Sequence, residues 1–329
     1  MPRLALTVEV EKLRFSAPFR ISGFVFEHQD AVLVTLDDGK HRGRGEACGV
    51  YYFDDHAERM VAAIESHRRE IESGIDRGSL QKLMPPGGAR NAVDCALWEF
   101  DARRAGKPVW QLAGLERPKP LLTTFTLGAE PPSVMAASAR GYVQAKAIKV
   151  KLTGDFDLDV ARVQAVRAAR PDMWLGVDAN QGYTIDKLRP LVDHLVAADV
   201  KLIEQPLARG READLEGLAS PIPIAADESV QGLADVAGLV GRFSVVNIKL
   251  DKCGGLTEGL AMAREARRLG LGVMVGNMMG SSLAMAPAYL VGQHCDVVDL
   301  DGPTFLARDR KPGVVYADGL ISCGEDVWG

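Results

Sequence analysis

Three acidic residues in the second half of the chain have the types and the spacing of a metal site. Asp178 lies in VDAN, Glu204 in LIEQP and Asp227 in AADES, each at the end of a short apolar stretch typical of a buried strand. Carboxylates without histidine or cysteine make a hard oxygen site, which suits Mg²⁺ and leaves positions for water and substrate. We therefore expect one Mg²⁺ per subunit. The alternative is that each acid caps a helix or pairs with a lysine.

Three lysines end apolar stretches of the same kind. Lys149 and Lys151 alternate in AIKVKL, so a strand would place both ammonium groups on one face, and Lys249 ends VNIKL. Two lysines on opposite sides of a metal-bound carboxylate suit removal of a proton from one face of a carbon and its return on the other. The metal would stabilise the enediolate that proton loss creates. The like charge of Lys149 would disfavour protonated Lys151 and keep it basic. Ion pairing and Schiff-base chemistry are the other interpretations.

The elements that must position these groups repeat as strands and helices from residue 121 onward. Strands are expected over 121–128, 147–152, 174–179, 200–205, 223–228, 244–250, 272–277 and 296–301. Most of the gaps hold a helical pattern such as TEGLAMAREARRLG. Eight such units predict a (β/α)8-type barrel, with its active site at the C-terminal ends of the strands. Lys151 and Lys249 would then lie on the second and sixth strands, which are diametrically opposite.

The first 120 residues follow a different pattern. Strand-like segments with an Asp-Gly turn at 38–39 precede helical patterns over 56–75 and 88–105. Strands followed by helices predict an α+β domain. We expect this domain over 1–120, with the tail, 304–329, returning to it, and the barrel over 121–303.

Composition and charge argue against several classes of protein. The chain has 329 residues, 47% hydrophobic and 25% charged, and its net charge of −5 argues against binding to nucleic acid or to an anionic membrane. Its five cysteines are dispersed without a CxxC pair, which indicates reduced thiols. We expect no signal peptide and no membrane span. These features predict a cytoplasmic protein that acts on a small molecule, and we expect a homo-oligomer.

Taken together, the motifs resemble those of the enolase superfamily, in its muconate-lactonizing-enzyme-like subgroup. KVK, VDAN, EQP, ADES and NIKLDKCGGLTE stand in the family's order and spacing, and ARNAVDCALWEFDARRAGKPV is similar to the helix that precedes its barrel. The resemblance implies an α/β fold: a modified (β/α)7β TIM-type barrel with an N-terminal α+β capping domain completed by the C-terminal tail. It implies Mg²⁺ ligands at Asp178, Glu204 and Asp227, acid/base catalysts at Lys151 and Lys249, and Lys149 near the substrate carboxylate.

A further pair of carboxylates narrows the choice among the reactions of the superfamily. Asp299 and Asp301 lie two apart in DLDGP, where the resemblance implies a pair that binds the α-ammonium group of a dipeptide. N-acylamino acid racemases and o-succinylbenzoate synthase have no free amine to bind. The resemblance therefore implies a dipeptide epimerase, an isomerase that inverts the C-terminal residue of an L,L-dipeptide. The alternatives are another reaction of the superfamily (racemase, cycloisomerase, dehydratase or o-succinylbenzoate synthase-like lyase), a non-catalytic binder, and pairing of these acids with Lys249.

Two segments of the cap, 17–30 and 48–55, should fold over the barrel mouth and select the substrate side chains. Ala-Glu epimerases of the family carry an arginine late in the first segment, and the corresponding position here is Phe26; Arg20 is the nearest cation. An apolar or aromatic substrate residue is therefore expected, with L-Ala-L-Glu and cationic dipeptides still open. The alternative is that the aromatic rings of these segments pack the cap on the barrel. The residues expected to contact the substrate side chains are Phe24, Phe26, Tyr51 and Met278.

Overall fold

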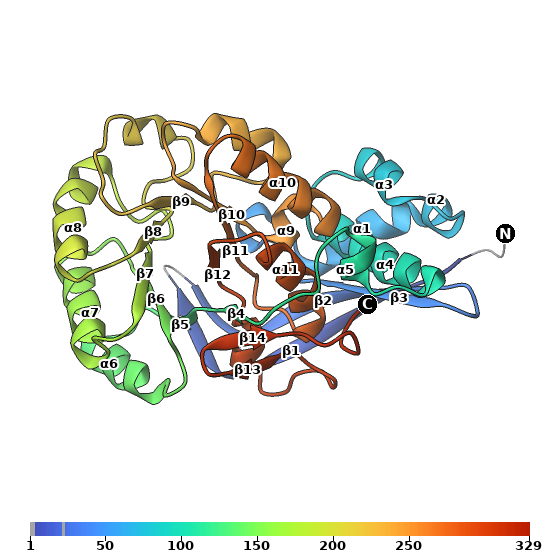
Figure 1. Ribbon diagram of the computed structural model, residues 1–329, viewed down its shortest axis with the longest axis horizontal. Helices are drawn as coiled ribbons and strands as arrows, with labels where there is room; N and C mark the ends of the chain where they lie inside the picture. The colour runs from blue at the N-terminus through green and yellow to red at the C-terminus, as the bar shows by residue number, and fades with distance from the viewer. Residues whose placement is uncertain (1–3, 22–23) are drawn as a thin grey trace.

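The computed structural model describes residues 4–21 and 24–329. Over these residues the chain forms a three-stranded antiparallel sheet, an eight-stranded parallel sheet and a small three-stranded sheet. Figure 1 shows the first sheet on the side of the N-terminus and the curled parallel sheet on the other side. We refer to these two parts as the cap and the barrel.

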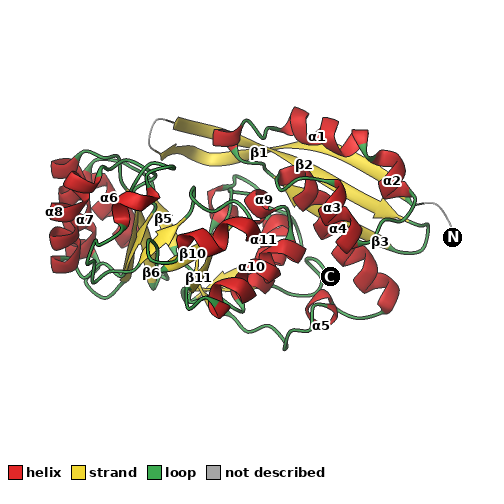
Figure 2. Ribbon diagram, turned by 90° about the horizontal axis from the view of Figure 1, so that it is seen from above, coloured by secondary structure: helices red, strands yellow, loops and turns green. Residues whose placement is uncertain are grey.

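The cap is a sheet covered by helices on one face, as Figure 2 shows from above. Its strands are β1 (Ala5–Ile21), β2 (Phe24–Asp37) and β3 (Arg42–Ala47). Its helical elements are η1 (Tyr51–Phe53), α1 (Ala57–Ser66), α2 (Arg68–Glu72), α3 (Arg77–Leu83), α4 (Gly88–Ala105) and α5 (Val109–Leu112). Val34, Met60 and Phe100 belong to the apolar core between sheet and helices. A Cβ on Gly45 would collide with the backbone of Ala92, so the close packing of β3 on α4 requires glycine there.

Two helix predictions in the cap have different outcomes. The helix expected over 56–75 is two helices, because His67 has φ −112° and ψ 15°, outside the helical region. The helix expected over 88–105 is confirmed as α4. It ends at Gly106, whose left-handed conformation (φ 61°) terminates the helix.

The barrel strands follow one another around the sheet in sequence order. They are β5 (Phe125–Leu127), β6 (Ala147–Lys151), β7 (Trp174–Asp178), β8 (Leu202–Glu204), β9 (Ile224–Ala226), β10 (Val245–Ile248), β11 (Gly272–Val275) and β12 (Val297–Val298). The ring closes where the Thr124 N–H donates to the Val298 carbonyl (3.0 Å). Each strand lies within a segment expected from the sequence, and the expected fold class is confirmed.

The connections are less regular than the strand–helix repeat predicts. The α-helices are α6 (Pro132–Gly141), α7 (Phe156–Ala169), α8 (Ile185–Ala197), α9 (Leu250–Cys253), α10 (Leu256–Arg268) and α11 (Ser282–Gly292). The 3-10 helices are η2 (Glu212–Leu215), η3 (Leu233–Leu239) and η4 (Gly302–Phe305). Only 3-10 helices, η2 and η3, occupy the connections on either side of β9 in the described chain.

The segment expected as one strand over 121–128 is divided between two sheets. Leu121–Leu122 forms β4, which pairs with β14 (Leu320–Ser322) and through it with β13 (Val315–Ala317). The backbone N–H of Thr123 donates to Gly319 (3.1 Å), whereas that of Thr124 donates to Val298 across the barrel seam. The chain therefore changes partners between these two threonines.

The C-terminal tail returns to the cap. The Ala307 N–H donates to the Arg14 carbonyl (2.8 Å), and Arg310 forms an ion pair with the buried Glu46 (2.7 Å). The Trp328 indole donates to the Arg44 carbonyl (2.9 Å). The domain limits at residues 120 and 303 remain a prediction.

The inside of the barrel is layered. Leu202, Ala225, Val245 and Met274 form a buried apolar cluster that also contacts Trp174. Leu202, Ala225 and Val245 each lie on the same strand face as a polar or charged residue two positions further on, because side chains alternate along a strand; these residues are Glu204, Asp227 and Asn247. The cluster therefore forms a floor beneath the charged layer at the barrel mouth. In the described chain, no helix combines the length and the apolar character needed to span a membrane.

Candidate active site

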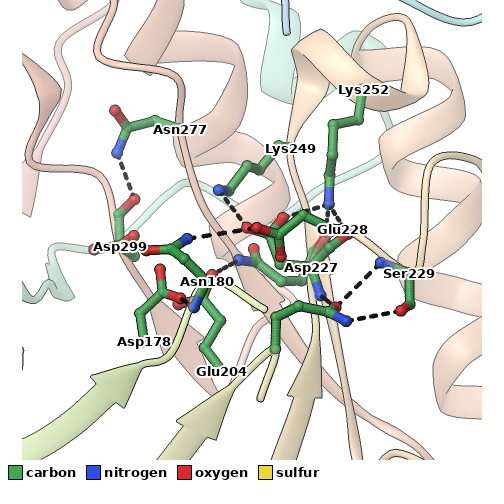
Figure 3. Close-up of polar contacts among 12 residues, drawn as sticks. Asp178, Asn180, Glu204, Asp227, Glu228, Ser229, Lys249, Lys252, Asn277 and Asp299 are labelled. Carbon is green, nitrogen blue, oxygen red and sulfur yellow. Dashed lines mark hydrogen bonds and ion pairs between the residues drawn. The ribbon is translucent and has the colours of Figure 1, made fainter. Parts of the chain in front are cut away.

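The carboxyl ends of the barrel strands and two cap segments enclose one pocket. The barrel contributes Lys149, Lys151, Asp227 and Lys249, among others, and the cap contributes aromatic rings. Figure 3 shows the polar groups converging from successive strands. The pocket thus lies where a barrel of this type places its active site.

The three acids expected to bind metal lie side by side. Asp178 and Glu204 occupy paired positions on β7 and β8, and Asp227 directly follows β9; all three are buried. Each acid has a partner within the protein. Lys151 contacts Asp178 (2.5 Å), and Asn247 donates to Glu204 (2.7 Å).

Asp227 is held by two lysines. Lys249 contacts its Oδ2 atom (2.7 Å) and Lys252 its Oδ1 atom (2.5 Å), as Figure 3 shows. Burial alone would raise the pKa of Asp227, but the two ammonium groups hold it below its usual range. Burial and the like charge of Asp178 instead raise the pKa of Glu204 to about 7.

The described residues contain no group of three or more acidic, histidine or cysteine side chains already arranged around a metal position. The charge balance nevertheless fits a divalent cation. Six carboxyl groups and four lysines are buried in this region: Asp178, Glu204, Asp227, Glu228, Asp299 and Asp301 with Lys149, Lys151, Lys249 and Lys252. The Glu228 Oε2 atom is buried without a hydrogen-bond partner among these residues. An excess of buried acid over base is what a bound dication would neutralise.

The two lysines expected to act as acid/base catalysts lie on opposite sides of the ring. Lys151 ends β6 and Lys249 follows β10, and three strands separate β6 from β10 in either direction. Lys151 also contacts the Asn180 Oδ1 atom (3.1 Å). Burial opposes the charge on Lys249, but Asp227 and Glu204 outweigh it and hold its pKa above the ordinary value. The predicted placement of the two lysines therefore matches the geometry.

Lys149 is surrounded by carboxylates that pair with its ammonium group. Its Nζ atom contacts Asp299 and lies 3.2 Å from Glu204. Burial would lower the pKa of Lys149, but these carboxylates raise it above the ordinary value. The positive charge of Lys149 is therefore balanced by Asp299 and Glu204. The tuning of Lys151 by Lys149 remains a prediction.

The acidic pair after β12 has two different environments. Asp299 is bound by Lys149 and the Thr124 hydroxyl, so it pairs with Lys149 and not with Lys249. Asp301 accepts a hydrogen bond from the Thr126 N–H (2.6 Å). Burial and the like charge of Asp299 raise the pKa of Asp301 to about 6.

Comparison with known protein families agrees with this arrangement. Residues 5–114 match the mandelate racemase/muconate lactonizing enzyme N-terminal domain, and residues 134–319 match the enolase C-terminal domain-like family. The chain belongs to the enolase superfamily.

Individual relatives cover nearly the whole chain. The L-Ala-D/L-Glu epimerase of Escherichia coli strain K12 is 38% identical over 92% of this chain and 95% of its own. The N-acetyl-D-glutamate racemase of a Pseudoalteromonas species is 36% identical over 91% of this chain and 95% of its own. A solved enolase-family structure from Agrobacterium tumefaciens, with bound sodium and L-Ala-L-Glu, aligns with a TM-score of 0.95 and 41% identity over 99% and 100%. The expectation of an isomerase is confirmed.

In this enolase-superfamily chain the cap closes the pocket with aromatic side chains. Phe26 and Tyr51 stack edge to face with ring centroids 5.4 Å apart, and both line the pocket with Met278. The side chains of Phe24 and Arg20 lie outside the described residues, so their predicted roles are not addressed.

Two lining residues were not singled out from the sequence. Phe19 and Phe305 pack edge to face at 4.7 Å beside the pocket. Met279 also lines the pocket, as does Tyr52 of the segment 48–55 that was expected over the barrel mouth. Phe305 belongs to η4, four residues after Asp301, so the motif DLDGP could have suggested it.

Residues inside the quoted motifs support the acids. Gln205 of EQP accepts the Asp227 N–H (2.9 Å) and donates to Ser229 (2.8 Å), which fixes the backbone at the third acid. Asn180 of VDAN contacts Lys151, and Asn247 donates to Glu204. Their positions within the motifs were available from the sequence, but their partners were not.

Proposed function

We propose that the protein is a Mg²⁺-dependent dipeptide epimerase that inverts the C-terminal residue of an L,L-dipeptide. The proposal rests chiefly on one observation. Lys151 and Lys249 enter the same buried pocket from opposite sides of the barrel. This arrangement suits a 1,1-proton transfer through an enediolate, in which one base serves each face of the α-carbon.

Asp178, Glu204 and Asp227 would hold the Mg²⁺ ion. They are buried oxygen donors from successive strands, in a region where carboxyl groups outnumber lysines. When bound, the ion would stabilise negative charge on the substrate carboxylate. This assignment fits the hard-ligand chemistry of the donor set.

The lysines of the chain would move the proton. Lys151 would exchange it with one face of the α-carbon and Lys249 with the other, so that one must be neutral while the other is charged. Each lysine is now paired with an acid, Lys151 with Asp178 and Lys249 with Asp227. Release of those acids is therefore required before either lysine acts as a base.

The acidic pair supports a substrate with a free amine. Asp299 and Asp301 are both buried, and Lys149, which also contacts Glu204, is the lysine that contacts Asp299. One shared ammonium group leaves the pair with excess negative charge, which the α-ammonium group of a dipeptide would offset. Dipeptides are therefore favoured over N-acylated amino acids.

An N-acylamino acid racemase is the second candidate. The observation in its favour is that Asp299 already has a cationic partner in Lys149, so a substrate amine is not required to neutralise it. The similarity to an N-acetyl-D-glutamate racemase points the same way. Asp301 favours the dipeptide, because no lysine contacts it among the described residues and its charge is left for a substrate ammonium group.

Deuterium exchange tests both candidates at once. The protein would be incubated with Mg²⁺ in D₂O with a library of L,L-dipeptides and with the matching N-acetyl amino acids, and mass would be recorded. We expect a gain of one mass unit on dipeptides at the C-terminal residue, with inversion. Exchange confined to N-acetyl amino acids would favour the second candidate, a product of altered connectivity would indicate a lyase or cycloisomerase, and no exchange would refute the proposal.

We also propose a homo-oligomer in the cytoplasm, as the sequence analysis expects. Analytical ultracentrifugation of the purified chain tests the first part, and a sedimentation coefficient of a 35.4 kDa monomer would refute it.

A further inference from the structure

The cap loop after β3 carries a buried hydroxyl group without a partner. Tyr52 lies in η1, and its side chain lines the same pocket as Lys151 and Lys249. Its Oη atom is buried, and it has no hydrogen-bond partner among residues 4–21 and 24–329. An unpaired buried hydroxyl costs free energy, and nearly all such groups in folded proteins have a partner. The Tyr52 hydroxyl is therefore a candidate for binding a ligand.

The surrounding contacts fix the position of Tyr52. On one side of it, the buried Asp251 carboxylate accepts a hydrogen bond from the Cys48 N–H (2.8 Å) and so ties the start of the loop to the barrel. On the other side, the Arg209 guanidinium lies over the Phe53 ring, 5.0 Å from its centroid. The loop is thus held at both ends, and the hydroxyl is positioned before any ligand arrives.

The neighbours of the hydroxyl indicate which part of a substrate it faces. The segment that carries Tyr52 contacts the barrel at Asp251, two residues after Lys249, and at Arg209, between β8 and β9. It therefore lies over the strand ends that carry Asp227 and Lys249, which are paired with each other at 2.7 Å. Asp299 and Asp301, the proposed ammonium site, follow β12, further around the ring. Tyr52 therefore lies near the C-terminal residue of the dipeptide, whose α-carbon is inverted, and away from the N-terminal residue.

We propose that the Tyr52 hydroxyl hydrogen bonds to the side chain of the inverted residue. The protein then prefers dipeptides whose C-terminal side chain carries a hydrogen-bonding group over those with an isosteric hydrocarbon. The inference rests on the proposed function. The physical reason for this preference is that a hydrocarbon beside Tyr52 leaves the buried hydroxyl unpaired, whereas a hydrogen-bonding group gives it a partner.

A substrate–enzyme cycle tests the proposal. L-Ala-L-Gln is compared with L-Ala-L-homoleucine, whose side chain has the same shape but no hydrogen-bonding atoms, in the wild-type protein and in Tyr52→Phe. We expect wild-type kcat/KM to favour the glutamine dipeptide by about tenfold or more. In Tyr52→Phe the ratio should approach one, through loss of activity on the glutamine dipeptide and with the homoleucine dipeptide changed less than about twofold.

The outcomes separate the two proposals. An unchanged ratio in Tyr52→Phe, or an equal loss on both dipeptides, would overturn the role of Tyr52 while leaving epimerisation intact. Absence of inversion with every dipeptide would instead refute the proposed function. Calorimetric binding of both dipeptides to Lys151→Ala protein, with and without Tyr52→Phe, measures the same cycle without turnover; equal losses of affinity there would also overturn the proposal.

Tyr289→Phe is the matched control. The Tyr289 hydroxyl donates to the Lys119 carbonyl (2.7 Å), and its ring lines a different cavity, so the substitution removes a hydroxyl that already has a partner. We expect the substrate ratio of Tyr289→Phe to equal that of the wild type. A shift of the ratio in this variant as large as in Tyr52→Phe would count against a specific contact.

Discussion

Lys149 of β6 and Asp299, which follows β12, form a buried ion pair across the seam where the barrel closes. Lys149 lies 4.0 Å from Asp178, the acid that Lys151 contacts at 2.5 Å, so its nearest carboxylate is Asp299 and not the partner of Lys151. Asp299 binds the lysine, whereas Asp301 accepts a hydrogen bond from a backbone N–H. The pair connects β6, which carries the proposed catalyst Lys151, to the proposed ammonium site. Its integrity should therefore matter for both stability and activity.

Breaking this pair should destabilise the fold. In Lys149→Met, Asp299 and Glu204 lose their ammonium partner inside the barrel, and we expect the free energy of unfolding to fall by about 3 kcal/mol or more. Urea denaturation at neutral pH with EDTA present measures it. A combined Lys149→Met and Asp299→Asn variant should lose less than the sum of the two single variants.

An exposed ion pair provides the control for that measurement. Lys146 and Asp318 are 2.8 Å apart with side chains 52% and 78% exposed. Lys146→Ala should change the free energy of unfolding by less than about 1 kcal/mol. If Lys149→Met cost no more than this control, the buried pair would not stabilise the barrel.

Each of the two lysines proposed as acid/base catalysts should control one face of the α-carbon. Lys151→Ala and Lys249→Ala should each abolish inversion, with a loss of about 100-fold or more, because one proton transfer lacks its acid or base. Each variant should still exchange the α-proton of one epimer with D₂O, and the two variants should serve opposite epimers. Proton NMR of the L,L- and L,D-dipeptides in D₂O distinguishes the faces.

The exposed Lys201, paired with Asp199 at 2.5 Å, supplies a lysine control outside the pocket. Lys201→Ala should retain wild-type inversion. Full turnover in either Lys151→Ala or Lys249→Ala would rule out a two-base mechanism.

Most of the barrel was predictable from the sequence, because buried parallel strands leave short apolar stretches that end in charged residues. The local backbone geometry could not be predicted from the sequence. The non-helical φ of His67 breaks a segment whose apolar periodicity is continuous, and the partners of Thr123 and Thr124 come from residues about 175 or more positions further on. Periodicity over a short window carries no information about such distant hydrogen bonds.

The identity of the site residues was predictable, but their pairing was not. The motifs fix which residues end the strands, and these ends meet in any closed barrel. The contact of Lys149 with Asp299 depends on how strands far apart in sequence meet at the seam, and that of Lys252 with Asp227 depends on how α9 packs beside the end of β9. The unpaired hydroxyl of Tyr52 depends on the cap loop packing over the barrel, which strand and helix patterns do not describe.

Mg²⁺ should stabilise the protein through the three buried acids. A ligand that binds only the folded state adds about 2.7 kcal/mol at a concentration of 100 times its Kd, so Tm should rise with added MgCl₂. Asp178→Asn should lower the Mg²⁺ affinity measured by calorimetry by at least about tenfold, and EDTA should abolish turnover of the wild type. Asp199→Asn, an acid with a 67% exposed side chain, should bind Mg²⁺ as the wild type does. Equal affinities in both variants would exclude Asp178 as a ligand.

Dipeptide binding should weaken as the pH falls through about 6. The charged groups and hydroxyls facing Asp301 are Asp299, Lys149, Thr126, Tyr142 and Tyr316. Burial together with Asp299 raises the pKa of Asp301 to about 6. Because this pKa is raised, the carboxylate that would bind the ammonium group is present above pH 6 and becomes protonated below it. At saturating Mg²⁺, KM should rise roughly tenfold per pH unit below the pKa of Asp301, and it should rise again above about pH 8, where the α-amino group of the dipeptide loses its proton. Asp301→Asn should have a high KM that does not vary over the acidic part of this range, and a wild-type KM equally independent of pH there would contradict the assignment of Asp301 to the ammonium site.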